Sequence, residues 1–304
     1  MSSLTAITVG NFDGVHLGHA ELVRTARRTI GNEGIVRVLS FDPHPSTVLN
    51  PRSASLRLST FRQRAEWLES LGADEVIRLQ PTSEFLSFSP EEFIRWLVGH
   101  HQPSIIVEGP DFRFGSERSG TIETLRKLQG KYEFETVVIE PVEASLSDGS
   151  LVQVSSSLIR WLIGQGRVRD AICLLGHPYE IRAMVVEGDR RGRTLGIPTA
   201  NLDHGEMMLP SDGIYAGHAW LPDGSEYPAA VSVGTKPTFG EHPRVCEAHL
   251  IGYDGPLDHY EWTIRLQFHE WLRDQITFSD VDALLSQMHR DLQETKTLAP
   301  VMTG

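Results

Sequence analysis

The chain has 304 residues, roughly twice the ~150 residues of an average domain, so two domains are expected. Hydrophobic residues make up 40% of the chain and charged residues 22%, which excludes disordered, collagen-like and coiled-coil proteins. The formal net charge of −12 argues against a nucleic acid as the main substrate, because the whole molecule repels phosphate backbones. A polyanionic small molecule must therefore be bound by a local group of backbone N–H groups, Arg, His or metal.

The cysteines and the N-terminus indicate the cellular compartment. Cys173 and Cys246 lie far apart and form no C-x-x-C pair, so neither a disulfide framework nor a zinc site is expected. The N-terminus has no basic region followed by an apolar one, and no stretch approaches the ~18 apolar residues that span a bilayer. The sequence therefore predicts a cytoplasmic protein without a membrane partner.

The first half of the chain alternates β-branched runs with amphipathic segments, which is typical of a parallel sheet covered on both faces. The predicted strands are Thr5–Val9, Ile35–Phe41, Glu75–Leu79, Ser104–Glu108 and Thr136–Glu140. The predicted helices are Glu21–Ile30, a segment opened by the N-cap Ser89 and by Pro90, and Glu123–Leu128 after the cap Thr121. This part is expected to be a doubly wound α/β domain.

Two short helices are predicted next, Leu158–Ile163 ending at Gly164 and Arg169–Leu175 ending at Gly176. His177-Pro178 then resembles a hinge. We therefore place one domain at residues 1–178 and another at 179–304.

The second half consists of strand-like runs separated by Gly, Pro and Asp turns, which predicts an antiparallel sheet or barrel. The runs are Tyr179–Glu187, Gly213–Leu221, Ala229–Val233, Cys246–Ile251 and Trp262–Phe268. An amphipathic helix capped by Ser279 closes the chain and carries Leu284, Leu285, Met288 and Leu292 on one face.

The first strand runs into Gly10-Asn11-Phe12-Asp13-Gly14-Val15-His16-Leu17-Gly18-His19 and then into a helix. Such a turn is where α/β proteins bind phosphate, because free N–H groups and the positive helix end point to one place. Histidines in a first helical turn oppose the helix dipole unless an anion lies near them, and Gly18 allows a ligand to approach the backbone. The alternative is a tight turn with two solvated histidines.

A second candidate phosphate site is Ser155-Ser156-Ser157-Leu158-Ile159-Arg160, where three hydroxyls open a helix and Arg160 lies about one turn further on. Taken alone, a capped helix with a surface arginine explains it as well. The chain contains neither a Walker lysine motif nor G-x-G-x-x-G, so P-loop and Rossmann binding are not supported.

The segment 188–201, GDRRGRTLGIPTAN, concentrates arginines and glycines and could cover a phosphate, although a solvated run of charges is the alternative. Its PTAN end offers a hydroxyl and an amide suited to Mg²⁺ and phosphate oxygens. Alternation in Val245-Cys246-Glu247-Ala248-His249-Leu250 places Glu247 and His249 opposite an apolar face. Glu247 could be a base for a substrate hydroxyl there, or only a surface strand residue.

The order and spacing of GNFDGVHLGH, FDPHP at 41–45, DFRFG at 111–115 and SSSLIR at 155–160 resemble the FMN adenylyltransferase module of the bifunctional prokaryotic riboflavin kinase/FAD synthetase family. The resemblance implies that His16 and His19 bind ATP phosphates. It also implies that the same nucleotide-binding loop contributes Gly10, Asn11, Asp13 and Gly18. The residues implied to lie near the flavin are Asp111, Phe112, Arg113 and Phe114. Those implied to steady the leaving pyrophosphate are Ser156, Ser157 and Arg160.

Residues 183–298 resemble the riboflavin kinase domain of the same family, a small β-barrel with a terminal helix. The resemblance implies Thr199 as the Mg²⁺ ligand with Asn201 as its partner, and Glu247 as the catalytic base. Gly188, Arg193 and Gly196 fall in the nucleotide loop. The chain departs from the family pattern at Ser232, at Lys236 and at Leu257-Asp258-His259.

The expected function is therefore bifunctional: riboflavin and ATP give FMN and ADP in the second domain, and FMN and ATP give FAD and pyrophosphate in the first. Riboflavin, FMN, FAD and ATP are the expected ligands, with Mg²⁺ as cofactor; the oligomeric state is not predicted. Two alternatives remain: a nucleotidyltransferase for another phosphorylated metabolite, and a flavin-binding regulator that has lost turnover.

Overall fold

The structure is a computed structural model that describes residues 4–53, 55–188, 191–235, 244–256 and 259–299. The chain divides into two compact units, each with its own core. The first unit comprises Met1–Leu56, Thr60–Ala144 and Leu151–Ser155; the second comprises Arg57–Ser59, Ser145–Ser150 and Ser156–Gly304. The boundary between residues 178 and 179 stays a prediction, and the two helices before it group with the second unit.

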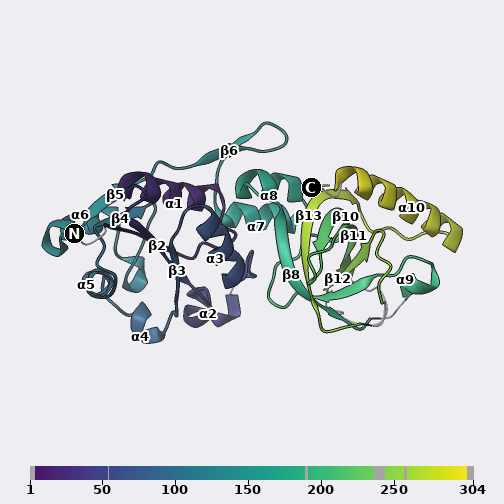
Figure 1. The fold of residues 1–304 in the computed structure, drawn as a ribbon, viewed down its shortest axis with the longest axis horizontal. Coiled ribbons are helices and arrows are strands. Elements are labelled where there is room, and N and C mark those ends of the chain that lie inside the picture. Colours follow the sequence, from purple (N-terminus) through teal and green to yellow (C-terminus); the bar gives the residue numbers. More distant parts are fainter. Residues whose placement is uncertain (1–3, 54, 189–190, 236–243, 257–258, 300–304) are drawn as a thin grey trace. The chain divides into compact units, whose positions relative to one another are not determined.

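The first unit is built on a parallel sheet of five strands in the order β3-β2-β1-β4-β5 (Figure 1). The strands are β1 Thr5–Gly10, β2 Ile35–Phe41, β3 Glu75–Leu79, β4 Ile105–Glu108 and β5 Glu135–Val138. All five predicted strands are present, with small shifts at their ends. The doubly wound fold class is confirmed, because helices cover both faces of this sheet.

Two separate apolar cores show which helices cover which face. α1 and α3 supply Leu22, Val23, Ala26 and Leu68 to the core on one face. α5 and α6 supply Phe93, Leu97, Ile122 and Leu125 to the core on the other face. The helices of this unit are α1 Leu17–Ile30, α2 Ser46–Leu49, α3 Phe61–Ser70, α4 Ser83–Leu86, α5 Pro90–His101 and α6 Ile122–Tyr132, with 3₁₀ turns at Pro51–Ser53 and Ser116–Arg118.

The strand order reverses between β1 and β4: successive strands are added on one side of β1 up to β3 and on the other side from β4 onward. Open α/β sheets bind ligands at such a reversal, at the carboxyl ends of the strands. The register of β1 with β4 runs only through Ala6↔Ile105 and Ile7↔Ile106. Beyond it, a carboxylate oxygen of Glu108 accepts a hydrogen bond of 2.7 Å from the Val9 N–H. The buried Glu108 side chain thus takes the place of a main-chain acceptor for Val9 at the carboxyl end of β1.

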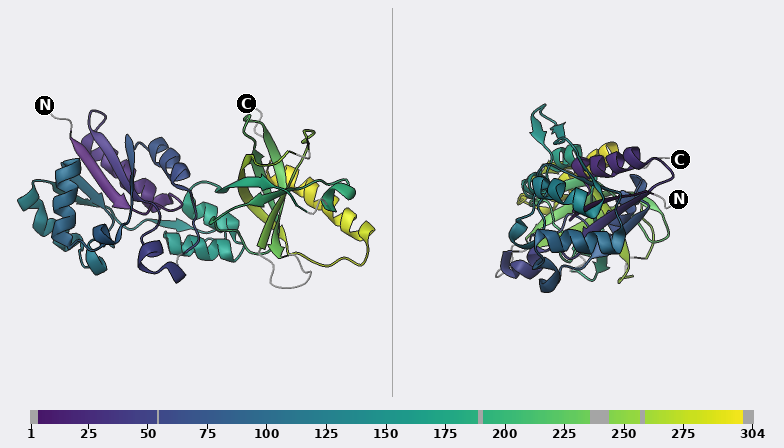
Figure 2. Two further views of the ribbon diagram at one scale, coloured as in Figure 1. Left: turned by 90° about the horizontal axis from the view of Figure 1, so that it is seen from below. Right: turned by 90° about the vertical axis from the view of Figure 1, so that its left-hand side faces the viewer.

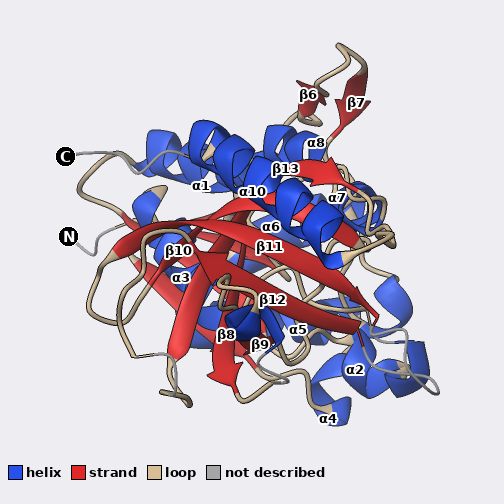
Figure 3. Cartoon of the chain, turned by 90° about the vertical axis from the view of Figure 1, so that its right-hand side faces the viewer, coloured by secondary structure: helices blue, strands red, loops and turns tan. Residues whose placement is uncertain are grey.

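The second unit is a closed barrel of six antiparallel strands in the order β10-β11-β12-β9-β8-β13 (Figure 3). The predicted antiparallel barrel is confirmed, with β9 as a sixth strand beside the five predicted runs. The strands are β8 Tyr179–Val186, β9 Ala200–Asp203, β10 Gly213–Trp220, β11 Glu226–Thr235, β12 Arg244–Leu250 and β13 Thr263–Arg273. The helices are α7 Ser156–Gly164, α8 Val168–Leu175, α9 Arg191–Thr194 and α10 Val281–Leu298. Helix α10 packs on β10 and β11 (Figure 2). A two-stranded hairpin, β6 Glu143–Ser145 and β7 Leu151–Gln153, precedes α7.

The structure corrects some element boundaries. Helix α1 begins at Leu17 rather than Glu21, because His16 is its N-cap. The terminal helix is capped by Asp280 rather than Ser279: the Asp280 carboxylate accepts from the Ala283 N–H at 2.8 Å, whereas Ser279 donates its hydroxyl to that same carboxylate. Among the described residues, no helix has both the length and the apolar composition that crossing a membrane requires.

Candidate active sites

The loop after β1 is held in an unusual backbone conformation. Phe12 and Val15 have φ values of 51° and 41°, in the left-handed region that aromatic and β-branched residues rarely adopt. Both side chains are buried in the core under α1, and the Val15 N–H donates to the Phe12 carbonyl at 3.0 Å. Core burial therefore fixes the geometry of the loop that carries Asn11, Asp13 and His16.

The two histidines predicted to bind phosphate lie face to face. The His16 and His19 rings stack with centroids 3.6 Å apart and an interplanar angle of 15°. His16 caps α1 by accepting the His19 N–H at its Nδ1. A Cβ on Gly18 would lie 3.1 Å from His16 Cε1, so glycine allows the ring to pack over the helix start. The structure thus brings His16, Gly18 and His19 together, as the motif predicts.

The surroundings of His19 disfavour its protonation. Burial first, then the neighbouring His16 and Arg64, lower the pKa of His19 well below its usual range. Within the described part of the chain, the buried Nδ1 of His19 and Oδ1 of Asn11 have no hydrogen-bond partner. Buried polar atoms are normally satisfied, so these two indicate that a polar ligand completes the site. An anionic ligand beside His19 would raise its pKa again.

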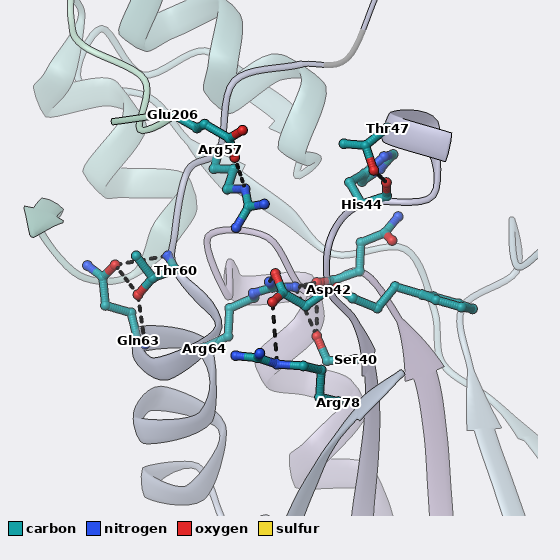
Figure 4. Close-up of polar contacts among 12 residues, drawn as sticks. Ser40, Asp42, His44, Thr47, Arg57, Thr60, Gln63, Arg64, Arg78 and Glu206 are labelled. Atoms are coloured by element: carbon teal, nitrogen blue, oxygen red, sulfur yellow. Dashed lines mark hydrogen bonds and ion pairs between the residues drawn. The ribbon is translucent and has the colours of Figure 1, made fainter. Parts of the chain in front are cut away.

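Arg64 of α3 contacts the same loop, and Figure 4 shows its side chain beside Ser40 and Asp42. Its guanidinium donates to the backbone oxygens of Asn11 at 2.6 Å and Phe41 at 2.8 Å, and to the Ser40 hydroxyl at 3.0 Å. It also forms an ion pair of 2.6 Å with Asp42, the aspartate of the FDPHP motif. The ends of β1 and β2 are therefore tied to one buried cation.

The segment predicted to lie near the flavin follows β4 at the same edge of the sheet. Asp111 is exposed and Phe112 is half-buried. The Phe112 and Phe114 rings stack at 5.3 Å, and Phe114 contacts Phe93 of α5. Burial raises the pKa of Glu108, just before this segment, well above its usual range. The edge thus combines exposed polar atoms with an aromatic surface.

Ser156, Ser157 and Arg160 lie in the first turns of α7, as the SSSLIR motif predicts. Ser157 is exposed, and Ser156 and Arg160 are half-buried. Helix α7 belongs to the second unit, so a shared site with His16 and His19 stays a prediction.

In the barrel, a first cavity is lined by Gly188, Arg193, Thr199 and Asn201. A Cβ on Gly188 would lie 2.0 Å from Asn201 Nδ2, so only glycine allows the amide to pack there. Gly196 has a φ of 76° and forms the turn after α9. The segment expected to be a charged loop thus contains the short helix α9, and its PTAN end runs into strand β9 rather than remaining a turn.

A second cavity is lined by Thr199, Ser232 and Glu247 from the barrel and by Met288 and Leu292 from α10. Glu247 pairs with Asn201 across β12 and β9, and with Ser232 across β12 and β11. Residues paired in this way lie side by side on one face of the sheet. Thr199 lines both cavities and therefore lies at their junction.

The predicted alternation in β12 is confirmed. Cys246, Ala248 and Leu250 are buried, whereas Glu247 and His249 are half-buried on the other face. His249 donates from Nδ1 to the Pro198 carbonyl at 2.7 Å, and burial lowers the pKa of this imidazole. A neutral histidine therefore fixes the residue that precedes Thr199.

An ion pair between Arg273 of β13 and Asp291 of α10 holds helix α10 beside the second cavity. The Arg273 guanidinium donates to both Asp291 carboxylate oxygens at distances between 2.7 and 3.1 Å, and Gln287 adds a bond of 2.8 Å to the same carboxylate. The Asp291 side chain is 7% exposed. Ser232, one of the departures from the family pattern, accepts from Gln275 at 3.0 Å. Lys236, Leu257 and Asp258 lie outside the described residues, and His259 lines the first cavity.

Comparison with known proteins gives two family matches: FAD synthetase at residues 2–156 and riboflavin kinase at residues 175–299. The bifunctional riboflavin kinase/FMN adenylyltransferase of Listeria monocytogenes is 32% identical over 296 residues, covering 95% of this chain and 91% of the relative. The Escherichia coli K12 protein of the same name is 31% identical over 287 residues, covering 94% and 90%. The chain belongs to the bifunctional riboflavin kinase/FMN adenylyltransferase family. The resemblance drawn from the motifs is confirmed.

The whole fold also has a counterpart among solved structures. A crystal structure of a macrolide-efflux protein from Streptococcus pneumoniae matches with a TM-score of 0.86 and 31% identity, covering 97% of this chain and 95% of that one. A parallel-sheet unit followed by a barrel with a terminal helix therefore occurs in a second protein at this level of identity.

Several residues of these sites were not assigned from the sequence. In the first unit they are Ser40, Arg64 and Glu108; in the barrel they are His249, Arg273 and Asp291. A local signal existed for Arg64, because Thr60 and Gln63 form a capping box that marks the start of α3. Arg273 and Asp291 meet only when the barrel is closed and α10 is packed on it, so no local pattern predicts them.

Proposed function

We propose that FMN adenylyltransferase activity resides at the β1 edge of the first unit. In this reaction an FMN phosphate oxygen attacks the α-phosphorus of ATP, and the bond to the β-phosphate oxygen breaks, releasing pyrophosphate. The attacking group is already an anion, so the site must orient the phosphates and offset their charge rather than remove a proton. The stacked rings of His16 and His19 at the positive end of α1 support this assignment.

The roles of the other first-unit residues are part of the same proposal. Asp111 and Phe112 contact the flavin, supported by the aromatic surface at the same strand edge. Ser156, Ser157 and Arg160 steady the pyrophosphate, supported by their position in the first turns of α7.

We propose that riboflavin kinase activity resides at the junction of the two barrel cavities. Glu247 accepts the proton of the terminal ribityl hydroxyl as its oxygen attacks the γ-phosphorus, and ADP leaves. Gly188 and Arg193 bind the nucleotide in the first cavity, and Gly196 shapes the turn that leads to it. The flavin enters the second cavity beside α10. The observation that carries this proposal is the junction itself: Thr199 lines both cavities, and Glu247 lies one strand from Asn201.

Thr199 and Asn201 would hold Mg²⁺ in the kinase site. Hydroxyl and amide oxygens suit this ion, which keeps several waters and binds substrate phosphates through few protein ligands. The glycine cradle around Asn201 keeps that amide in place. Among the described residues no three His, Cys, Asp or Glu side chains gather into a metal site. When bound, the ion offsets phosphate charge.

We also propose a cytoplasmic enzyme with small-molecule ligands and no nucleic-acid substrate. Both cysteines are free in the structure, and the net charge of −12 supports the exclusion of a nucleic-acid substrate.

The test compares His19→Ala and Glu247→Gln in the full chain, with FMN and FAD resolved by chromatography. The first variant should lose FAD formation from FMN and ATP and keep FMN formation from riboflavin and ATP. The second should show the reverse. Parallel loss of both activities in either folded variant would contradict two separate sites. Retention of FAD formation by the first would remove His19 from the adenylyltransferase site, whereas absence of FAD formation in the wild type would return the alternative of another phosphorylated substrate.

A further inference from the structure

We propose that Arg64 is a positioning residue for adenylyl transfer, holding the phosphate-binding loop and the FDPHP segment in one geometry. This inference rests on the proposed function of the first unit. Arg64 lies outside the motifs that suggested that function, and it contacts the loop from α3.

The main-chain register of β1 with β2 ends at Gly10↔Ser40. Asn11 is the next residue, where the chain leaves the sheet. Its carbonyl accepts from Arg64 at 2.6 Å and from the Ser40 hydroxyl at 3.2 Å. The guanidinium thus links Asn11 to Phe41, one residue beyond the last β1–β2 pair, because it donates to both carbonyls. The position of Asn11 is set by these bonds.

The other end of the fork reaches Asp42, in the second loop at this edge. Its ion pair with Arg64 is nearly buried, with side-chain exposures of 5% and 11%. Arg78 of β3 approaches the other Asp42 oxygen at 3.4 Å (Figure 4). Two cations against one carboxylate leave a positive charge at the edge where a triphosphate is expected, in a chain of net charge −12.

A fork of this kind cannot be replaced by a simple cation. Arg64 contacts Asn11, Ser40 and Phe41 through Nη1 and Asp42 through Nη2, so two nitrogens of one rigid plane reach both loops, whereas a lysine has a single nitrogen on a flexible stem. The same charge lies near enough to His19 to contribute to its lowered pKa, after burial and His16. Charge and geometry at this position can therefore be separated by two substitutions.

The experiment compares Arg64→Met, Arg64→Lys and the matched control Arg62→Met in the full chain. Arg62 lies on the same helix, has 82% side-chain exposure and forms an ion pair with Glu66 at 2.9 Å. FAD formation from FMN and ATP gives kcat and KM, and FMN formation by the barrel is the internal control. The pKa of His19 is followed by imidazole NMR, and hydrogen exchange of β1 reports whether the first unit is folded.

The methionine variant should lose about 10²-fold in kcat/KM for FAD formation, since a displacement near 1 Å of a binding group has that effect. Its His19 pKa should rise, because a nearby positive charge has gone. The lysine variant should keep the low pKa and recover only part of the rate. The Arg62 control and FMN formation should match wild type.

Wild-type FAD kinetics in the methionine variant would overturn the inference. Loss of β1 hydrogen-exchange protection in both Arg64 variants would also overturn it, because Arg64 would then only stabilise the fold. Full recovery of the FAD-forming rate by lysine would overturn it too, because any positive charge would then suffice. Failure of the proposed function is distinguishable: His19→Ala, run alongside, would then form FAD at the wild-type rate whatever the Arg64 variants do.

Discussion

Replacing Glu108 by glutamine should make the first unit more stable at neutral pH. The Glu108 side chain is buried, with 2% of the residue exposed, and burial raises the pKa of its carboxyl well above the usual range. The Val9 N–H donates to this carboxyl at 2.7 Å, and a glutamine oxygen can accept the same bond. The substitution therefore keeps the contact and removes only the ionisation.

The sign and size follow from proton linkage. Below a pH of about 4.3, the ordinary value for glutamate, the folded and unfolded chains both hold the proton, and the contribution to stability is fully present. Above it the unfolded chain releases the proton while the folded chain keeps it. The free energy of unfolding of the wild type then falls by about 1.4 kcal/mol per pH unit until the pH passes the folded pKa. Glutamine has no such loss.

The measurement is native-state hydrogen exchange of the β1 peptide in wild type and Glu108→Gln at pH 5, 6 and 7, which reports on the first unit without interference from the barrel. Comparison at equal pH cancels the intrinsic exchange rate. The exposed Glu33→Gln controls for the change in net charge. A difference between wild type and Glu108→Gln that stays constant over this range would refute the reasoning, because it would mean that Glu108 ionises normally in the folded chain.

Three other outcomes are expected. Thr199→Ala should raise the Mg²⁺ concentration needed for FMN synthesis, while FAD formation from added FMN persists; an unchanged Mg²⁺ titration would remove Thr199 from the metal site. Glu247→Gln should lower single-turnover FMN formation by 10²- to 10⁴-fold, the typical worth of a general base, with riboflavin binding and melting little changed; a near-normal rate would show that another group takes the proton. A fragment of residues 156–304 should be more stable to urea than one of residues 180–304 by about 3–6 kcal/mol, because the longer one keeps Leu174 and Leu175 of α8 buried; equal midpoints would show that α8 adds nothing to the barrel.

Much of the fold could be predicted because its signals are local. Alternation in Cys246–Leu250 identified the polar face of β12, and the β-branched runs identified the five parallel strands. Strand β9 was missed because Pro198 suggested a turn, and its pairing with β12 depends on a partner more than forty residues further along the chain. Pairing between distant segments leaves no local pattern.

The candidate sites divide in the same way. His16, Gly18 and His19 lie within four residues, so their meeting at a helix start could be predicted. Arg64 reaches Asn11 across fifty-three positions, and Arg273 reaches Asp291 only after the barrel has closed. Buried contacts of this kind depend on tertiary packing. In the sequence, each partner is only a charged residue in an ordinary helix or strand, with nothing to indicate that the two meet.

The register of β12 also limits how this barrel can change length during evolution. Side chains alternate along a strand, so a one-residue insertion between Arg244 and Glu247 would turn the carboxylate into the apolar interior and bring Cys246 or Ala248 to the cavity. An insertion of two residues would return the Glu247 carboxylate to the cavity face, but Glu247 would no longer pair with Asn201 and Ser232. The turn at Pro222–Gly224 is exposed and has no such restriction, so insertions in homologous chains are expected there and not in β12.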